Sequence, residues 1–180
     1  VLNQEPCPPA FSTAVEGSGD SASVLLAQGQ TWAEDVFDRQ ASQSINGISA
    51  VTPNDIWAVG DNFSLAGVVL HYNGSGWSSQ AAAASVDWVS FNFNDVYMRN
   101  ATDGWAVGSK GKIYRYDGVS WREFKDIQSI AWNAVWVAAD NSDGWLVGDG
   151  GAVRRWSPTT PNSAAPGGFG DWVTVPGNPL

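Results

Sequence analysis

The chain has 180 residues, which is enough for one domain with a sizeable core, and 18 acidic against 9 basic residues give it a formal charge of −9. That charge repels nucleic-acid phosphates and anionic lipid surfaces, so nucleic acid is not expected as a partner. No apolar run reaches the roughly 18 to 20 residues that span a bilayer, so no membrane span is expected either. The 11 Trp and 20 Gly, with only 15% charged residues, are typical of a turn-rich β-protein and not of a helical bundle.

Residues 1–20 are predicted to form an extended segment, because the run EPCPPA is too rich in proline for a regular strand or helix. Cys7 is the only cysteine, so the chain can form no internal disulfide and no cysteine metal cluster. A tethering or incidental thiol is the expected role. The first residue is Val1 and not Met, which indicates a removed N-terminal segment or a partial sequence.

Residues 21–45 are predicted to hold half of a repeat unit. The run SASVLLAQGQTW at 21–32 aligns with KGKIYRYDGVSW at 110–121, so that Trp32 corresponds to Trp121. This half unit is expected to contribute two strands.

Three full copies follow, with Trp57, Trp105 and Trp145 each opening a run of two apolar residues and a glycine. An Asp stands two residues before each Trp, and an aromatic residue follows the glycine in every copy. The three Trp side chains are expected to pack in the core, between neighbouring units.

Each copy divides into four short runs rich in β-branched and aromatic residues, at about 93–98, 104–108, 111–116 and 120–124 in the second copy. Asp-Gly and Asn-Gly stand between the last two runs, in YDGVSW and YNGSGW, where a hairpin needs positive φ angles. Each copy is therefore predicted to be a four-stranded antiparallel meander. No comparable window has helical spacing, although AEDVFDRQASQSI could form a single turn.

A four-stranded unit of this length, repeated along a chain, is typical of a β-propeller blade. The run DGWAVGSKGKIYRYDGVSW resembles the blades of bacterial propellers of the photosystem II assembly factor type and of the sialidase-like Asp-box type. The resemblance covers about residues 21–175 and implies a propeller fold. The Asp-box itself is shortened here to Asp117, Gly118 and Trp121, and the first copy has Asn73 for the Asp.

The fold class predicted is therefore all-β, with about 3.5 propeller blades. The blades are placed at 21–45 (half), 46–90, 91–130 and 131–175, and residues 176–180 form a C-terminal tail. Propellers close with about 4 to 8 blades, so the ring is expected to be incomplete in this chain. The missing blades would belong to a longer chain, or copies of this chain or another subunit would complete the ring.

Three tryptophans are candidates for ligand binding, because they fall outside the shared positions or occur once: Trp88, Trp132 and Trp136. Exposed aromatic rings can stack on sugars or anchor a protein partner, with burial in the core as the alternative. Asp140 and Asp149 complete the candidate set. Together with Asp143 they could supply oxygen ligands to calcium, although the spacing does not fit a helix-loop-helix calcium loop, and no other cofactor is expected.

The repeated Asp55, Asp103 and Asp143 are expected to stabilise turns, because a catalytic carboxylate pair needs two different environments and a repeat supplies similar ones. His71 is the only histidine and occupies the position of Arg115 and Arg155 in the other copies. It is expected to be an exposed strand residue. The arginines show no cluster in the sequence of the kind that a sialidase uses to hold a carboxylate.

Three N-glycosylation triplets begin at Asn62, Asn73 and Asn100, all at turn or insertion positions. With the acidic charge and few lysines, they favour a secreted or cell-envelope location.

The function predicted is an extracytoplasmic binding or assembly module, non-catalytic, that presents loops to a protein or glycan partner. One alternative is a fragment of a sialidase-like hydrolase or lyase, and another is a structural subunit of a filament or surface layer in which chains self-assemble. The parts that the copies do not share, DNFSLAG and the 157–171 loop among them, are the expected location of the function.

Overall fold

A computed structural model describes residues 23–28, 31–36, 43–62, 66–80, 91–127, 130–162 and 168–177. The chain forms two compact units, Val1–Ser42 and Gln43–Leu180. In the first unit, β1 (Ser23–Gln28) pairs antiparallel with β2 (Thr31–Val36), which are the two strands expected for the half unit. Trp88 and Cys7 lie outside the described residues.

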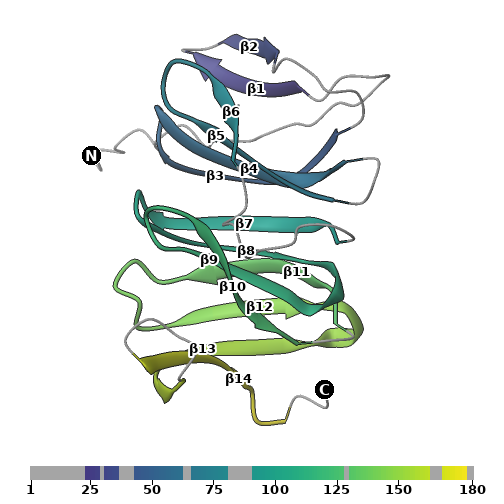
Figure 1. The fold of residues 1–180 in the computed structure, drawn as a ribbon, viewed down its shortest axis with the longest axis vertical. Coiled ribbons are helices and arrows are strands. Elements are labelled where there is room, and N and C mark those ends of the chain that lie inside the picture. Colours follow the sequence, from purple (N-terminus) through teal and green to yellow (C-terminus); the bar gives the residue numbers. More distant parts are fainter. Residues whose placement is uncertain are drawn as a thin grey trace, which may run out of the picture. The chain divides into compact units, whose positions relative to one another are not determined.

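The second unit contains three four-stranded antiparallel sheets, each a meander of four consecutive strands (Figure 1). The first sheet has β3 (Gln43–Thr52), β4 (Asp55–Asn62), β5 (Gly67–Tyr72) and β6 (Trp77–Ser79). The second has β7 (Phe93–Asn100), β8 (Asp103–Gly108), β9 (Lys112–Tyr116) and β10 (Trp121–Asp126). The third has β11 (Trp132–Val137), β12 (Gly144–Gly148), β13 (Val153–Pro161) and β14 (Phe169–Thr174).

The all-β prediction and the four-strand division of each copy are confirmed by these sheets. The described residues contain only two short 3-10 turns, Ser109–Gly111 and Asp149–Gly151, and none of their helices is long and apolar enough to cross a membrane. The predicted hairpin turns also form: Gly74 and Gly118 have φ of 87° and 89°, in the region that favours glycine.

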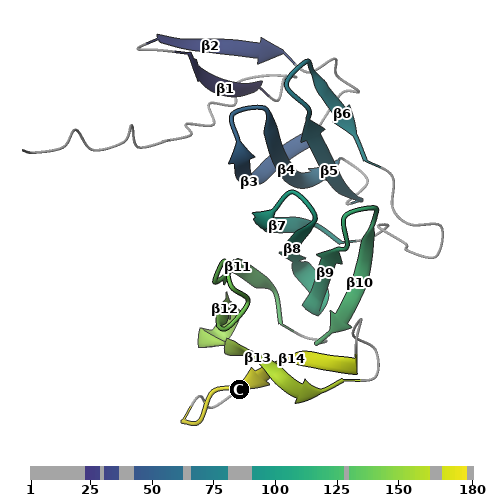
Figure 2. The same ribbon diagram turned by 90° about the vertical axis from the view of Figure 1, so that its left-hand side faces the viewer.

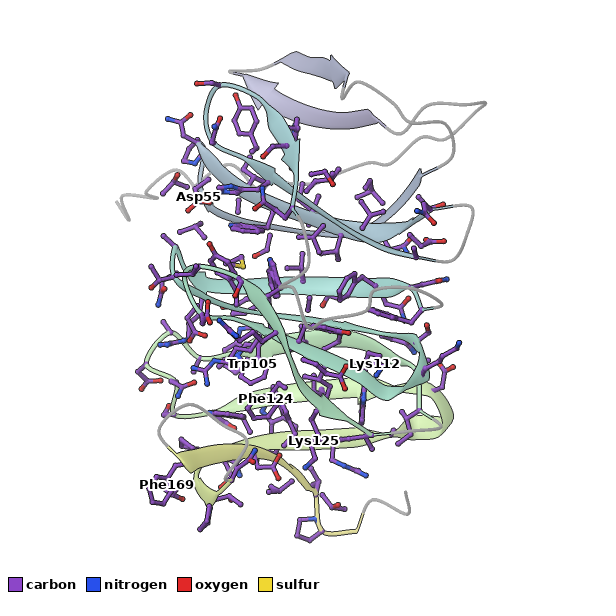
Figure 3. The ribbon with its side chains drawn as sticks, in the orientation of Figure 1. Asp55, Trp105, Lys112, Phe124, Lys125 and Phe169 are labelled. Carbon is purple, nitrogen blue, oxygen red and sulfur yellow. The ribbon has the colours of Figure 1, made fainter. Side chains whose placement is uncertain are left out.

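The sheets of the second unit pack face to face in chain order. Figure 2 shows their first strands, β3, β7 and β11, along one side, and these strands are neighbours in space. The first core cluster lies between the first and second sheets and contains Trp57, Val59, Met98, Tyr114 and Trp121 among others. The second lies between the second and third sheets, where Figure 3 shows Trp105 beside Phe124, with 4.9 Å between ring centroids.

The glycine that ends each Trp run is required by a close approach of two strands. A Cβ on Gly60 would lie 1.7 Å from the Ser44 carbonyl oxygen, and one on Gly108 would lie 1.9 Å from that of Asn92. Real Cβ atoms do not come this close to a carbonyl, so these positions accept no side chain without a backbone shift. The glycine is therefore repeated because the strands pack closely at this position.

A second repeated feature joins neighbouring sheets. The register of the first strand of each sheet shifts at one asparagine: Asn46, Asn94 and Asn133. The side-chain amide of Asn46 donates to the Phe93 carbonyl at 2.8 Å, and that of Asn94 donates to the Trp132 carbonyl at 2.9 Å. The β-bulges of the first and second sheets thus each direct an amide at the first strand of the next sheet, whereas Asn133 of the third sheet donates to Asp149.

The predicted Trp core is confirmed at two positions and corrected at the third. Trp57 and Trp105 are buried, because the next sheet covers them, whereas Trp145 in the third sheet is only half-buried. Its equivalents pack on a following sheet, and the described residues place no such sheet against Trp145.

Candidate functional site

Each sheet of the second unit carries the same carboxylate, basic side chain and indole. The Asp that precedes the repeated Trp binds the basic residue opposite that Trp on the next strand. The three contacts are His71–Asp55 at 2.8 Å, Arg115–Asp103 at 2.9 Å and Arg155–Asp143 at 2.8 Å. These carboxylates therefore bind basic side chains of the next strand, a role that the sequence, which suggested turn stabilisation, did not indicate.

His71 is not the exposed strand residue that we expected. Its ring stacks on Trp57 at 4.1 Å between centroids, and Nε2 lies against Asp55 Oδ1. Trp57 also donates its indole N–H to Asp55. His71 thus takes the structural place that arginine has in the other two sheets.

The second sheet adds further arginines around this unit. Arg99 binds the same Asp103 carboxylate as Arg115, with its Nε 2.8 Å from Oδ2, and its Nη1 donates to the Ala139 carbonyl of the third sheet at 2.7 Å. The Arg115 guanidinium lies over the rings of Trp105 and Trp156, at 5.1 and 6.0 Å from their centroids. Both guanidiniums are therefore held by the buried Asp103 carboxylate, and that of Arg115 is held by cation–π contacts as well.

These groups line a pocket of about 330 Å³ at one end of the second sheet. We call it the arginine pocket, and its lining residues are Arg99, Thr102, Asp103, Arg115, Tyr116, Asp117, Arg122, Glu123 and Phe124. Tyr116 and Phe124 supply an aromatic wall. Burial, with the Asp117 and Asp55 charges as smaller causes, raises the pKa of Tyr116, so its hydroxyl keeps its proton at neutral pH.

Arg122 is the most accessible cation of the arginine pocket, with 60% of its side chain exposed. Its Nε donates to Asp117 Oδ2 at 2.7 Å, and its two Nη groups have no hydrogen-bond partner among the described residues. The hydrogen bond from Arg122, with the Ser120 backbone N–H as the next cause, lowers the pKa of Asp117 to about 2. Asp117 therefore stays ionised, and Arg122 presents free donors to a ligand.

The lining of the arginine pocket is less acidic than the chain as a whole. It contains three arginines and three acidic side chains, and one of the latter, Glu123, also binds Lys112 at 3.1 Å. The chain carries a formal charge of −9. On an acidic protein, a site whose charges balance and whose arginine donors are accessible favours an anionic group more than the rest of the surface does.

The candidate tryptophans have different fates. Trp132 is fully buried in the second core cluster, at the position of Phe93, so it is removed from the set of surface residues. The sequence missed this equivalence because Trp132 was not aligned with Phe93. Trp136 is 47% exposed and lies 6.5 Å from Tyr97 between ring centroids.

The candidate aspartates do not form one group. Asp140 accepts hydrogen bonds from the backbone and hydroxyl of Ser142, Asp149 accepts one from Asn133, and Asp143 binds Arg155. No three His, Cys, Asp or Glu residues of the described ranges gather as a metal site would require. Calcium binding stays a prediction that nothing here tests.

All three glycosylation asparagines fall among the described residues. Asn73 and Asn100 use Oδ1 to cap the turns that follow, accepting from Ser75 N and Thr102 N at 3.0 and 2.9 Å. Asn62 Oδ1 accepts from Ala66 N across the insertion of the first copy. Asn73 and Asn100 thus each precede a turn, and Phe63 and Ser64 of the first triplet lie outside the described residues.

The arginine pocket itself was not predicted. Arg99 and Arg122 stand where the other copies have no arginine; Ser78 and Val173 occupy the place of Arg122. The pocket could have been suspected from two arginines, Arg99 and Arg122, that occur in one copy only, the first of them four residues before the repeated Asp103.

Comparison with known proteins shows the fold. No protein-family model matches the sequence, and no curated protein does. Among solved structures, YCF48 bound to D1 peptide is similar with a TM-score of 0.56 and 18% identity, over 78% of this chain and 45% of that one. YCF48 from Cyanidioschyzon merolae has a TM-score of 0.55 and 16% identity over the same shares. A fucose-specific lectin from Aleuria aurantia has a TM-score of 0.56 and 14% identity, over 91% of this chain and 55% of that one.

These neighbours are β-propellers, so the three sheets of the second unit are propeller blades and the predicted fold class is confirmed. The chain spans about half the length of each neighbour, and three four-stranded sheets do not close a ring.

Proposed function

We propose that this chain is a non-catalytic binding module whose arginine pocket holds an acidic, extended segment of a partner protein. The observation that carries the proposal is the convergence of Arg99, Arg115 and Arg122 on one pocket, with the Nη donors of Arg122 unused by the described residues. Guanidinium groups bind carboxylates through paired hydrogen bonds. The wall of Tyr116 and Phe124 suits an apolar side chain beside the acidic one.

The roles of the carboxylates favour binding over hydrolysis. Both oxygens of Asp103 already accept from guanidiniums, and Asp117 accepts from Arg122 and two backbone N–H groups. A general acid or nucleophile needs a carboxyl oxygen directed at the substrate. A solved neighbour with a bound peptide, YCF48, supports a peptide as the ligand class.

The test measures, by isothermal titration calorimetry, the affinity of the chain for a hexapeptide of alternating Glu and Leu with acetylated and amidated ends. Arg122→Gln should weaken binding by about tenfold or more, because a hydrogen bond to a charged group contributes about 1.5 to 3 kcal/mol. Arg155→Gln is the matched control, because Arg155 is also an exposed, ion-paired arginine but does not line the pocket.

Two results would reject this function. Equal losses from Arg122→Gln and Arg155→Gln would mean that the peptide binds the protein by general attraction. Binding of L-fucose, with no binding of the acidic peptide, would favour the glycan partner, for which similarity to a fucose-specific lectin is the supporting observation.

We further propose that the protein acts outside the cytoplasm, as a secreted or cell-envelope glycoprotein. The support is the position of Asn73 and Asn100 in turns. Mass spectrometry of glycopeptides from native material should show a glycan on at least one of the three asparagines. If the peptides that contain all three asparagines are unmodified, the proposal that the protein is a glycoprotein is rejected.

A further inference from the structure

The first sheet differs from the other two in the base of the repeated unit of carboxylate, basic side chain and indole. The base is His71 in the first sheet and arginine in the second and third. Arginine stays charged at every physiological pH, whereas histidine is the side chain whose charge changes between about pH 5 and 8. Of the three repeated carboxylates, Asp55 is therefore the one whose neutralising charge depends on pH.

His71 and Asp55 are held against the repeated indole of their sheet. His71 Nε2 lies 2.8 Å from Asp55 Oδ1, and the same oxygen accepts the indole N–H of Trp57 at 3.1 Å. The imidazole ring stacks on Trp57, with 4.1 Å between ring centroids and 22° between the planes. Only 25% of the His71 side chain and 22% of the Asp55 side chain are exposed, so water screens their charges in part.

Trp57 also connects this contact to the arginine pocket. Its ring lies 4.7 Å from that of Tyr116 between centroids, and Tyr116 lines the pocket. Burial, the Asp117 charge and then the Asp55 charge raise the pKa of Tyr116, so Asp55 is near enough to act on this side chain. The Asp55 charge therefore lies within reach of a ligand that contacts Tyr116.

The other groups that face this contact do not change charge near neutral pH. Within the described part of the first sheet, the strands β4 and β6 that flank His71 bring one charged partner to it, Asp55. The second sheet adds Tyr116, whose raised pKa keeps it neutral, and Asp117, whose pKa of about 2 keeps it ionised. Because His71 is the only histidine of the chain, a charge change between about pH 5.5 and 7.5 at this place is its own.

We infer that His71 regulates the arginine pocket, which binds an acidic segment more tightly when His71 is protonated than when it is neutral. The three arginines and three acidic side chains of the lining balance, so one more carboxylate beside them decides the sign of the local charge. A neutral His71 leaves Asp55 to repel an anionic ligand, and a protonated His71 cancels that charge. The inference rests on the proposed function, because it concerns the affinity of the same pocket for the same ligand.

The test measures the affinity for the Glu-Leu hexapeptide by isothermal titration calorimetry at about pH 5.5 and about pH 7.5, at low ionic strength. The wild-type chain should bind about two- to fivefold more tightly at the lower pH. His71→Arg, which supplies the base of the other sheets, should bind tightly at both pH values because its charge is permanent. His71→Gln, which carries no charge, should bind weakly at both.

Two controls separate His71 from other titrating groups. A hexapeptide with cysteic acid in place of glutamate keeps its charge at both pH values, and it should give the same ratio of affinities. Arg155→His places an imidazole beside Asp143 in the third sheet, where Trp145 belongs to neither core cluster and Arg155 does not line the pocket. This variant should keep the wild-type ratio.

Bound peptide should also act on His71, because the coupling between two binding events is reciprocal. The imidazole C–H signals of His71 in NMR spectra should titrate at a higher pH with peptide than without it. Equal wild-type affinities at the two pH values, or a pH dependence that His71→Gln retains, would overturn this inference, while binding that depends on Arg122 would keep the proposed function. A peptide that binds at neither pH would reject both.

Discussion

At the scale of single residues, the repeated Asp and Trp are structural. Asp55, Asp103 and Asp143 each bind a basic side chain that lies against the repeated indole, so the three groups stabilise one another in every sheet. The sequence showed the repetition and the equivalence of His71 with Arg115 and Arg155. It did not show that these basic residues bind the repeated Asp, because the contact forms only when neighbouring strands pair.

One residue-scale prediction concerns the ionisation of Asp117. The Arg122 hydrogen bond is the largest cause of its lowered pKa, so Arg122→Gln should raise that pKa from about 2 toward its ordinary value of 3.8. Because the folded-state pKa is the lower one, the stabilisation is present above about 3.8 and is lost as pH falls toward 2. Carboxyl-carbon NMR titration of both proteins checks this, and an unchanged Asp117 pKa would contradict the assigned hydrogen bond.

At the scale of strands and sheets, hydrophobic alternation and turn residues sufficed to place the elements of each copy. The second sheet runs over Phe93–Asn100, Asp103–Gly108, Lys112–Tyr116 and Trp121–Asp126, close to the four predicted runs. The register of the first strand of each sheet could not be predicted from the alternation, because each of these strands contains a β-bulge that shifts the pairing by one residue. Trp132, a ligand-binding candidate for which burial was the alternative, lies buried next to such a bulge.

The asparagine at the bulge gives an element-scale prediction. Asn94→Ala should lower the free energy of unfolding by about 1 to 3 kcal/mol, because it leaves the Trp132 carbonyl without its inter-sheet donor. Asn133→Ala removes an exposed contact within one sheet, and its effect should stay within about 0.5 kcal/mol. Urea denaturation of dilute, monomeric protein measures both changes. Equal losses would show that the bulge residue matters only for its own strand.

At the scale of the whole molecule, the sequence predicted the function only in general terms. It predicted that binding would depend on what the copies do not share, and this stays a prediction; the proposed arginine pocket is of that kind, since Arg99 and Arg122 are specific to the second copy. The pocket could not be located from the sequence, because 22 positions separate these arginines and only the meander brings them together. The described residues of the predicted loops at 61–67 and 157–171 do not line it, and the second segment is corrected in part, because β13 extends to Pro161 and β14 begins at Phe169.

The central claim is that ligands bind where the second sheet departs from the repeat, and arginine side-chain NMR with the Glu-Leu hexapeptide tests it most directly. The Nε–Hε signals of Arg99, Arg115 and Arg122 should shift in a saturable manner as peptide is added, while those of Arg154 and Arg155 stay in place. Shifts confined to Arg154 and Arg155, or equal at these two and the three pocket arginines, would contradict the claim.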